Sequence, residues 1–164
     1  MAARKSLSFG LALLCSACAV AIGPPPPRAS QLAGTGDPRF RASQDLVLEG
    51  LEADGRGQTE RARSRFERAL QVDSSNPWAY LALARHHLDA GRAGRARQHA
   101  ERAAVLFESL DPPTPGALVH CDGLRGAALA LEGRDAEARP LLDAAARSAP
   151  AIWGDAHLSP DELR

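Results

Sequence analysis

Aromatic residues and net charge are both scarce in this sequence. Phe, Trp and Tyr make up 4% of its 164 residues, so the core of a folded domain has to be built mainly from Ala and Leu. The 20 Lys and Arg residues balance the 20 Asp and Glu residues, which gives a formal net charge of zero. That balance argues against a nucleic-acid-binding protein, because such proteins neutralise phosphates with an excess of positive charge.

Cysteine is scarce as well, with three residues in the chain. Cys15 and Cys18 lie in a segment that has the features of an export signal, which leaves Cys121 as the thiol of the mature domain. One thiol provides no intramolecular disulfide framework. Cys121 stands near Leu118 and Leu124, so we expect a small buried side chain there and not a nucleophile.

Motifs that carry chemistry are also missing. The sequence has no phosphate-binding Gly loop, no nucleophile elbow and no paired metal-ligand motif. His86, His87 and His99 suggest a metal site, but adjacent residues on a helix point about 100° apart and cannot easily share one ion. We expect His87 at the core or its boundary. The sequence therefore predicts neither an enzyme nor a protein that holds a metal or another cofactor.

Residues 1–22 have the pattern of an export signal. Arg4 and Lys5 form a positive end, and the apolar run at 7–14 is too short to span a bilayer comfortably. The Ser-Ala-Cys sequence that ends at Cys18 resembles the end of a bacterial lipobox, although Cys15 replaces the usual Leu. This match predicts lipidation of Cys18 and a lipoprotein of the inner or outer membrane that faces the periplasm.

Ordinary signal cleavage is the alternative, because Ala19-Val20-Ala21 is a small-x-small site. Cleavage after Ala21 would give a secreted or periplasmic protein that begins at Ile22. Residues 23–42 then read as a Pro- and Gly-rich linker. Pro24–Pro27 must be extended and Gly34–Pro38 offers nothing to pack, so we expect a tether in front of the folded domain.

The rest of the chain repeats itself every 34 residues, and a third copy follows after an insert near 111–118. Within a copy, small residues recur at helical spacing and a Gly interrupts them, which predicts two helices joined by a tight turn. One such hairpin cannot bury its apolar face, so copies must stack. The matching positions are Gly50, Gly57, Ala62, Phe66 and Ala69; Ala84, Gly91, Ala96, Ala100 and Ala103; and Gly126, Gly133, Ala138, Leu142 and Ala145.

This pattern resembles the tetratricopeptide repeat. The repeats occupy 43–150, with copies at about 43–76, 77–110 and 119–152, and residues 151–164 form a C-terminal cap over the open end of the third copy. Glu49 and Arg125 depart from the pattern, which has Leu at their positions. The resemblance implies an all-α fold, a short α-solenoid of about three helix-turn-helix repeats.

We expect helices at 43–54, 58–72, 77–89, 93–108, 117–131 and 135–148. Asn76-Pro77 is a start signal, with Asn as N-cap and Pro at the first helical position. The Pro-rich stretch Asp111–Gly116 predicts a surface loop. Ser159 and Glu162 predict a last helical turn, which is either vestigial or completed by a partner.

The first helix of the second copy carries two stripes at helical spacing. Tyr80, Leu83, Ala84 and His87 form the stripe that packs the hairpin. The second stripe matches the positions that line the concave, peptide-binding groove of tetratricopeptide repeats. The alternative is that Trp78 and Leu81 pack against a neighbouring helix. The groove residues that the resemblance implies are Trp78, Leu81, Arg85 and Leu88, with Val47 and Leu51 in the first copy and Ala127, Ala130 and Leu131 in the third.

The resemblance and the export signal together predict a function. They indicate a non-catalytic protein–protein interaction module, exported and anchored to the membrane by lipid, which acts as scaffold or assembly factor in the bacterial cell envelope. Its partner would be a protein or peptide and not a nucleic acid. The alternative is an accessory or regulatory subunit of an envelope enzyme.

Overall fold

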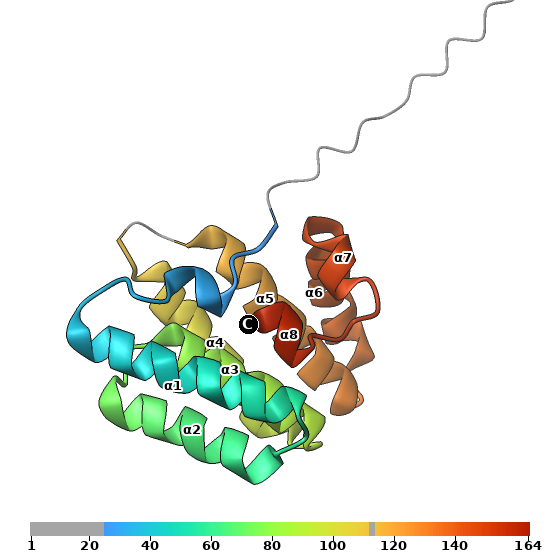
Figure 1. Ribbon diagram of the computed structural model, residues 1–164. Coiled ribbons are helices and arrows are strands. Elements are labelled where there is room, and N and C mark those ends of the chain that lie inside the picture. Colours follow the sequence, from blue (N-terminus) through green and yellow to red (C-terminus); the bar gives the residue numbers. More distant parts are fainter. Residues whose placement is uncertain (1–24, 112–113) are drawn as a thin grey trace, which may run out of the picture.

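The computed structural model describes residues 25–111 and 114–164, so the expected signal and Cys18 lie outside the described residues. The described part is helical, and its helices α1 to α6 form three antiparallel pairs that stack on one another (Figure 1). The chain is therefore a short α-solenoid of helix-turn-helix repeats. In chain order the elements are η1 (Ala29–Leu32), α1 (Pro38–Gly55), α2 (Thr59–Val72), α3 (Pro77–Asp89), α4 (Ala93–Glu108), α5 (Pro115–Leu131), α6 (Asp135–Ser148), α7 (Pro150–Trp153) and α8 (Pro160–Leu163).

The three hairpins turn in the same way. Gly57, Gly91 and Gly133 have φ angles of +71°, +69° and +74°, in the left-handed region that residues with a Cβ rarely adopt. The residue after each Gly donates its N–H back to the carbonyl five residues earlier, at 2.8–2.9 Å, as in Arg92 N–H to His87 O. This shared turn is the physical basis of the repeating glycine in the sequence.

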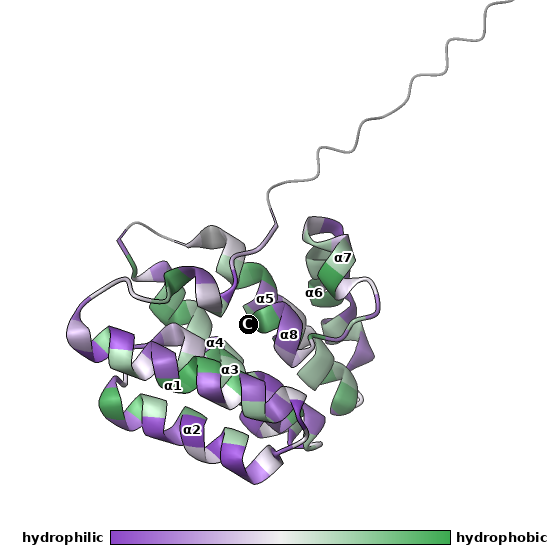
Figure 2. Ribbon diagram, viewed as in Figure 1, coloured by the Kyte–Doolittle hydropathy of each residue, from purple (hydrophilic) through white to green (hydrophobic). Residues whose placement is uncertain are grey.

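Small residues let the two helices of a hairpin approach closely, as predicted. Gly50 on α1 lies directly against the ring of Phe66 on α2, and a Cβ at Gly126 on α5 would come within 2.9 Å of Leu142 Cγ on α6. The core is rich in alanine because of these close crossings. Figure 2 shows apolar ribbon on α3 and α5 inside the stack and mainly polar ribbon on the outer α2. The fully buried alanines include Ala62, Ala69, Ala82, Ala96, Ala100 and Ala103.

The observed bounds of α3, α4 and α6 agree with the prediction at both ends. Asn76 caps α3 as expected: its side chain accepts a hydrogen bond from Trp78 N–H at 3.0 Å, and Pro77 occupies the first turn. The start of α5 was predicted two residues too late. Pro115 begins this helix, because a first-turn residue needs no N–H for intrahelical bonding.

The linker prediction for 23–42 is wrong for its described part. α1 begins at Pro38, because Asp37 caps it with a 2.8 Å hydrogen bond from Phe40 N–H. Farther upstream, η1 forms and Ala29 is fully buried. Its carbonyl accepts a 2.7 Å hydrogen bond from Gln44 Nε2 on α1. The segment therefore packs on the repeats. Among the helices of residues 25–111 and 114–164, none is long and apolar enough to cross a membrane.

Candidate functional site

The predicted groove stripe lies on α1, α3 and α5, the first helices of the three repeats. Most of it is covered. Trp78 and Leu81 are 0% exposed and Arg85 is 1% exposed, and Val47 and Leu51 on α1 are buried equally deeply. These five residues do not line an open groove, so that prediction is wrong for them. The alternative packing interpretation holds for Trp78, whose indole meets the ring of Phe107 on α4 edge to face, with centroids 5.1 Å apart.

The C-terminal segment, Leu158–Arg164, provides part of this cover. Leu158 and Leu163 are 1% and 0% exposed. α8 contacts α1 and lies across the inner side of the stack (Figure 1). Ser30 N–H donates to the carbonyl of Arg164 at 2.8 Å, which joins the segment to η1 at the other end of the chain. The cap therefore runs from the third repeat back to the first, instead of closing only the open end of the third copy.

The turn at the C-terminus forms as predicted. Glu162 N–H donates to Ser159 Oγ at 3.2 Å, and Ser159 N–H donates to Glu162 Oε2 at 2.8 Å. These two hydrogen bonds make a complete capping box. No partner chain is needed to complete this turn.

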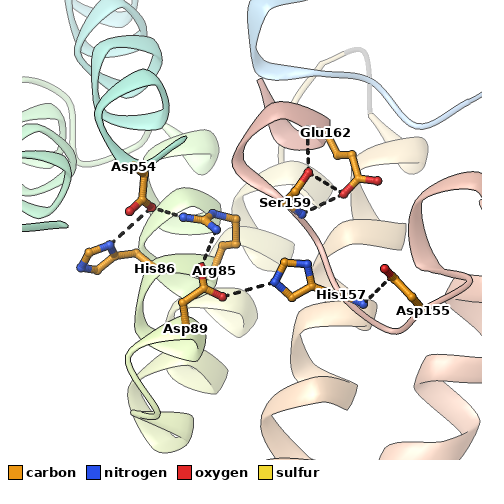
Figure 3. A network of polar contacts seen from close by, with 8 residues as sticks. All are labelled: Asp54, Arg85, His86, Asp89, Asp155, His157, Ser159 and Glu162. Atoms are coloured by element: carbon orange, nitrogen blue, oxygen red, sulfur yellow. Dashed lines mark hydrogen bonds and ion pairs between the residues drawn. The ribbon is translucent and has the colours of Figure 1, made fainter. Parts of the chain in front are cut away.

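A network of charged and polar side chains joins α1, α3 and the loop before α8 (Figure 3). Arg85 on α3 forms ion pairs with Asp54 on α1 and, at 2.6 Å, with Asp89. His86 Nδ1 lies 3.5 Å from Asp54, and His157 Nε2 lies 3.6 Å from Asp89. Burial lowers the pKa of Arg85 and the neighbouring Asp89 opposes that shift. Because the Arg85 and Asp54 side chains are only 2% and 9% exposed, this ion pair holds α3 against α1 and is closed to solvent.

One stretch of the predicted groove stays open. Leu88, Ala127 and Leu131, three of the predicted groove residues, line a hollow of about 450 Å³ at the ends of α3 and α5. Leu131 is 53% exposed, which is unusual for a large apolar side chain in this molecule. We call this surface the apolar hollow. The hollow is also lined by Ala130, another predicted groove residue, and by Asp89, Leu142, Ala156 and His157.

Two histidines of the second repeat, one on α3 and one on α4, form a stacked pair. His87 and His99 rings lie parallel within 13°, with centroids 5.2 Å apart. Burial is the main cause that lowers the pKa of His87 to about 4, and the pKa of His99 falls for the same reason. His87 is 4% exposed and belongs to the core, as predicted. Across residues 25–111 and 114–164, no group of three or more His, Cys, Asp or Glu side chains could hold a metal ion.

Cys121 is fully buried on α5, as predicted, and burial raises the pKa of its thiol to about 12. A neutral, buried thiol is a poor nucleophile. His120 beside it is also fully buried, and neither of its ring nitrogens makes a hydrogen bond of normal geometry. The ring lies 6.4 Å from the indole of Trp153 on α7.

The sequence prediction missed a buried polar cluster that holds the first repeat to the second. Asn76 Nδ2 donates to Ser43 Oγ and to Gln44 Oε1, both at 3.0 Å. Ser43 Oγ in turn donates to the carbonyl of Ala69 at 3.0 Å. Polar side chains in the middle of an apolar helical stripe are the signal that could have revealed this cluster.

Comparison with known proteins agrees with the repeat geometry. Residues 55–104, which run from the end of α1 into α4, match the family model described as tetratricopeptide repeat. No curated protein and no solved structure matches the chain. The matched stretch contains two of the glycine turns, at Gly57 and Gly91, and the complete helices α2 and α3 between them. The family match and the repeated glycine turns together support a tetratricopeptide repeat protein, and such repeats indicate a protein–protein interaction module.

Proposed function

We propose that this protein is an exported scaffold or assembly factor of the bacterial cell envelope, which is anchored by a lipid on Cys18 and binds a protein partner at the apolar hollow. The observation that carries the binding surface is the exposure of Leu131 beside Leu88 and Ala127. An apolar hollow rimmed by polar groups, here Asp89 and His157, is typical of a protein-binding surface. The export signal in residues 1–22 supports the envelope location.

The exposed large apolar side chains in the described residues offer a matched pair for the test. Leu131 is 53% exposed in the hollow, and Val105 is 54% exposed on α4. A photo-crosslinking amino acid is placed at one position or the other in the full chain, and the cells are irradiated. We expect a discrete crosslinked product from position 131 and none from position 105. Equal products from both positions, or none from 131, would reject the hollow as the binding surface.

The identity of the crosslinked protein then decides the role of the module. A structural component of the envelope supports the scaffold function. An enzyme whose activity depends on this chain would assign it instead as an accessory or regulatory subunit. In both cases Ala127→Glu, with the photo-crosslinking amino acid kept at position 131, should abolish the product, because a carboxylate in the hollow has to be desolvated when the partner binds. Val105→Glu is the control and should leave the product unchanged.

A further inference from the structure

We propose that the C-terminal segment Leu158–Arg164 is a built-in ligand of the concave face, and that the partner displaces it with a segment of the same chemistry. That chemistry is an apolar residue, a Ser or Thr followed by Pro, a carboxylate that completes the capping box, and a Leu. The inference rests on the proposed function, since it describes how a partner gains access to the covered part of the same stripe.

Two leucines of the segment are buried in the hydrophobic core. Leu158 and Leu163 are 1% and 0% exposed, although they lie near the end of the chain. Burial of each leucine removes apolar surface from water on both sides of the contact. The segment therefore occupies the inner face as a ligand would, with two apolar anchors five positions apart in the sequence.

The polar groups of the segment are satisfied within the segment. The Ser159–Glu162 capping box supplies its own hydrogen bonds, and Pro160 at the first helical position has no N–H to satisfy. In the part of the chain that the structure describes, the hydrogen bond from Ser30 N–H to the Arg164 carbonyl ties the segment to η1. A preformed turn that makes few hydrogen bonds to its surroundings can dissociate and be replaced. Neither the turn nor the surface under it is then left with buried polar groups that lack a hydrogen-bond partner.

The loop in front of the segment is suited to opening. Ala156 has a φ angle of +59°, and it is the non-glycine residue in the left-handed region among the described residues. Such a conformation is strained for a residue with a Cβ. The contact from His157 to Asp89 spans 3.6 Å between half-exposed side chains, so it adds little resistance.

The open hollow and the covered face meet at this loop. Ala156 and His157 line the apolar hollow and also lead directly into the segment. A partner that docks on Leu131 therefore touches the residues that must move when the segment leaves. Leu88 of the hollow continues along α3 into Arg85 and Leu81, which lie on the covered face. The predicted groove is thus one continuous stripe, partly open and partly self-occupied.

The first experiment measures binding of a fluorescent peptide with the sequence of residues 155–164 to the full chain. A tethered segment competes at an effective concentration of about millimolar, so the wild type should bind the peptide only weakly. Leu163→Ser in the chain weakens the internal competitor, and we expect it to raise the affinity for the peptide by about tenfold or more. A peptide that itself carries Leu163→Ser should not bind either protein.

The second experiment uses a reversible lock, which keeps the test decisive if Leu163→Ser fails to fold. A Cβ at Gly55 would lie 3.9 Å from the Cβ of Pro160, within the range of a disulfide. Gly55→Cys with Pro160→Cys is made in the full chain with Cys15→Ser and Cys18→Ser. We expect weak binding of the peptide to the reduced protein, as to the wild type, and no binding to the oxidised protein. The native Cys121 thiol is buried and should not exchange with this pair.

Three results would overturn the inference. The peptide could fail to bind both Leu163→Ser and the reduced lock variant, or it could bind the oxidised and reduced forms equally. The lock variant could also form dimers when its disulfide is reduced and lose them when it is oxidised. That result would show that the concave face binds a second copy of the chain and not a different partner. The crosslink at position 131 is measured separately, so the inference can fail while the hollow remains the binding surface.

Discussion

The indole of Trp153 lies directly on Gly123, where a Cβ would overlap the ring. Gly123 lies on α5, and Trp153, which is 1% exposed, is the last residue of α7. The glycine therefore provides the space in which the last part of the chain returns to the repeats.

Gly123→Ala should lower the free energy of unfolding by about 1–3 kcal/mol, because an added methyl group at a packed contact forces the ring or the helix to shift. Urea or thermal unfolding measures the change. Gly94→Ala is the matched control, since a Cβ there meets only the flexible end of Glu132 at 3.8 Å. Alanine favours a helix over glycine, so the control should be neutral or slightly stabilising. A loss of stability in the control equal to that of Gly123→Ala would contradict the packing argument.

Ala156→Gly should stabilise the fold by up to about 1 kcal/mol. Glycine adopts a φ angle of +59° without the steric penalty of a Cβ, although the gain is reduced by the greater entropy of glycine in the unfolded chain. Gly57→Ala, at φ +71°, should have the opposite sign. Denaturant midpoints of the two variants test this pair of signs. A stabilising Gly57→Ala or a clearly destabilising Ala156→Gly would show that the left-handed conformation does not determine how these substitutions change stability.

The fold should lose stability as the solution becomes acidic. Burial is the main cause that lowers the pKa of His120 to about 4 from 6.5, while the carbonyl of Pro27 and Glu162 act to raise it. Because the unfolded chain takes up this proton first, stability is complete above about pH 6.5 and decreases as the pH falls towards 4. The loss reaches about 3 kcal/mol for a shift of this size. His87, with a pKa of about 4, should contribute in the same direction.

His120→Leu separates the contribution of this histidine. The variant keeps a buried side chain of similar volume but cannot take up a proton, so the fall in stability between pH 7 and 4.5 should be smaller than in the wild type. Urea unfolding at several pH values measures both slopes. An unchanged slope in His120→Leu would mean that other groups, His87 among them, cause the acid sensitivity.

Arg85→Ala should destabilise the protein by about 3–5 kcal/mol, because it leaves the carboxylate of Asp54 buried without its partner. Replacing both residues, as Arg85→Met with Asp54→Leu, should restore part of that loss. The exposed pair of Arg134 and Glu137 is the control, and its removal should change the free energy of unfolding far less, because water and salt screen the two charges. Equal effects at the two pairs would show that burial of the Arg85 network is not what makes it sensitive.

The repeats could be predicted from the sequence, but their cover could not. Gly57, Gly91 and Gly133 mark the turns, because the left-handed backbone of each turn favours glycine. The same requirement recurs in every repeat, so it is visible in the sequence as a period. A period also shows which residues share a face, as Trp78 and Arg85 do. It does not show what packs on that face, which depends on contacts between residues far apart in the chain.

The ends of the chain illustrate this limit. Asp37-Pro38 is the same start signal as Asn76-Pro77, and it could have placed the beginning of α1 correctly. Ser159 and Glu162 did predict a turn. Neither local signal indicates that η1 and α8 meet over the inner face, where Ser30 bonds to Arg164. Most residues of the predicted groove are therefore buried and do not form an open surface.

The lipid anchor is tested by Cys18→Ser. If Cys18 carries the lipid, the wild type should incorporate labelled fatty acid and sediment with membranes, whereas Cys18→Ser should do neither. Cys15→Ser is the matched control: its thiol would be removed with the signal, so lipidation should persist. A wild type that remains in the soluble fraction and begins at Ile22 by mass spectrometry would contradict the lipoprotein proposal. That result would leave export itself intact, because cleavage after Ala21 also requires the signal to have been recognised.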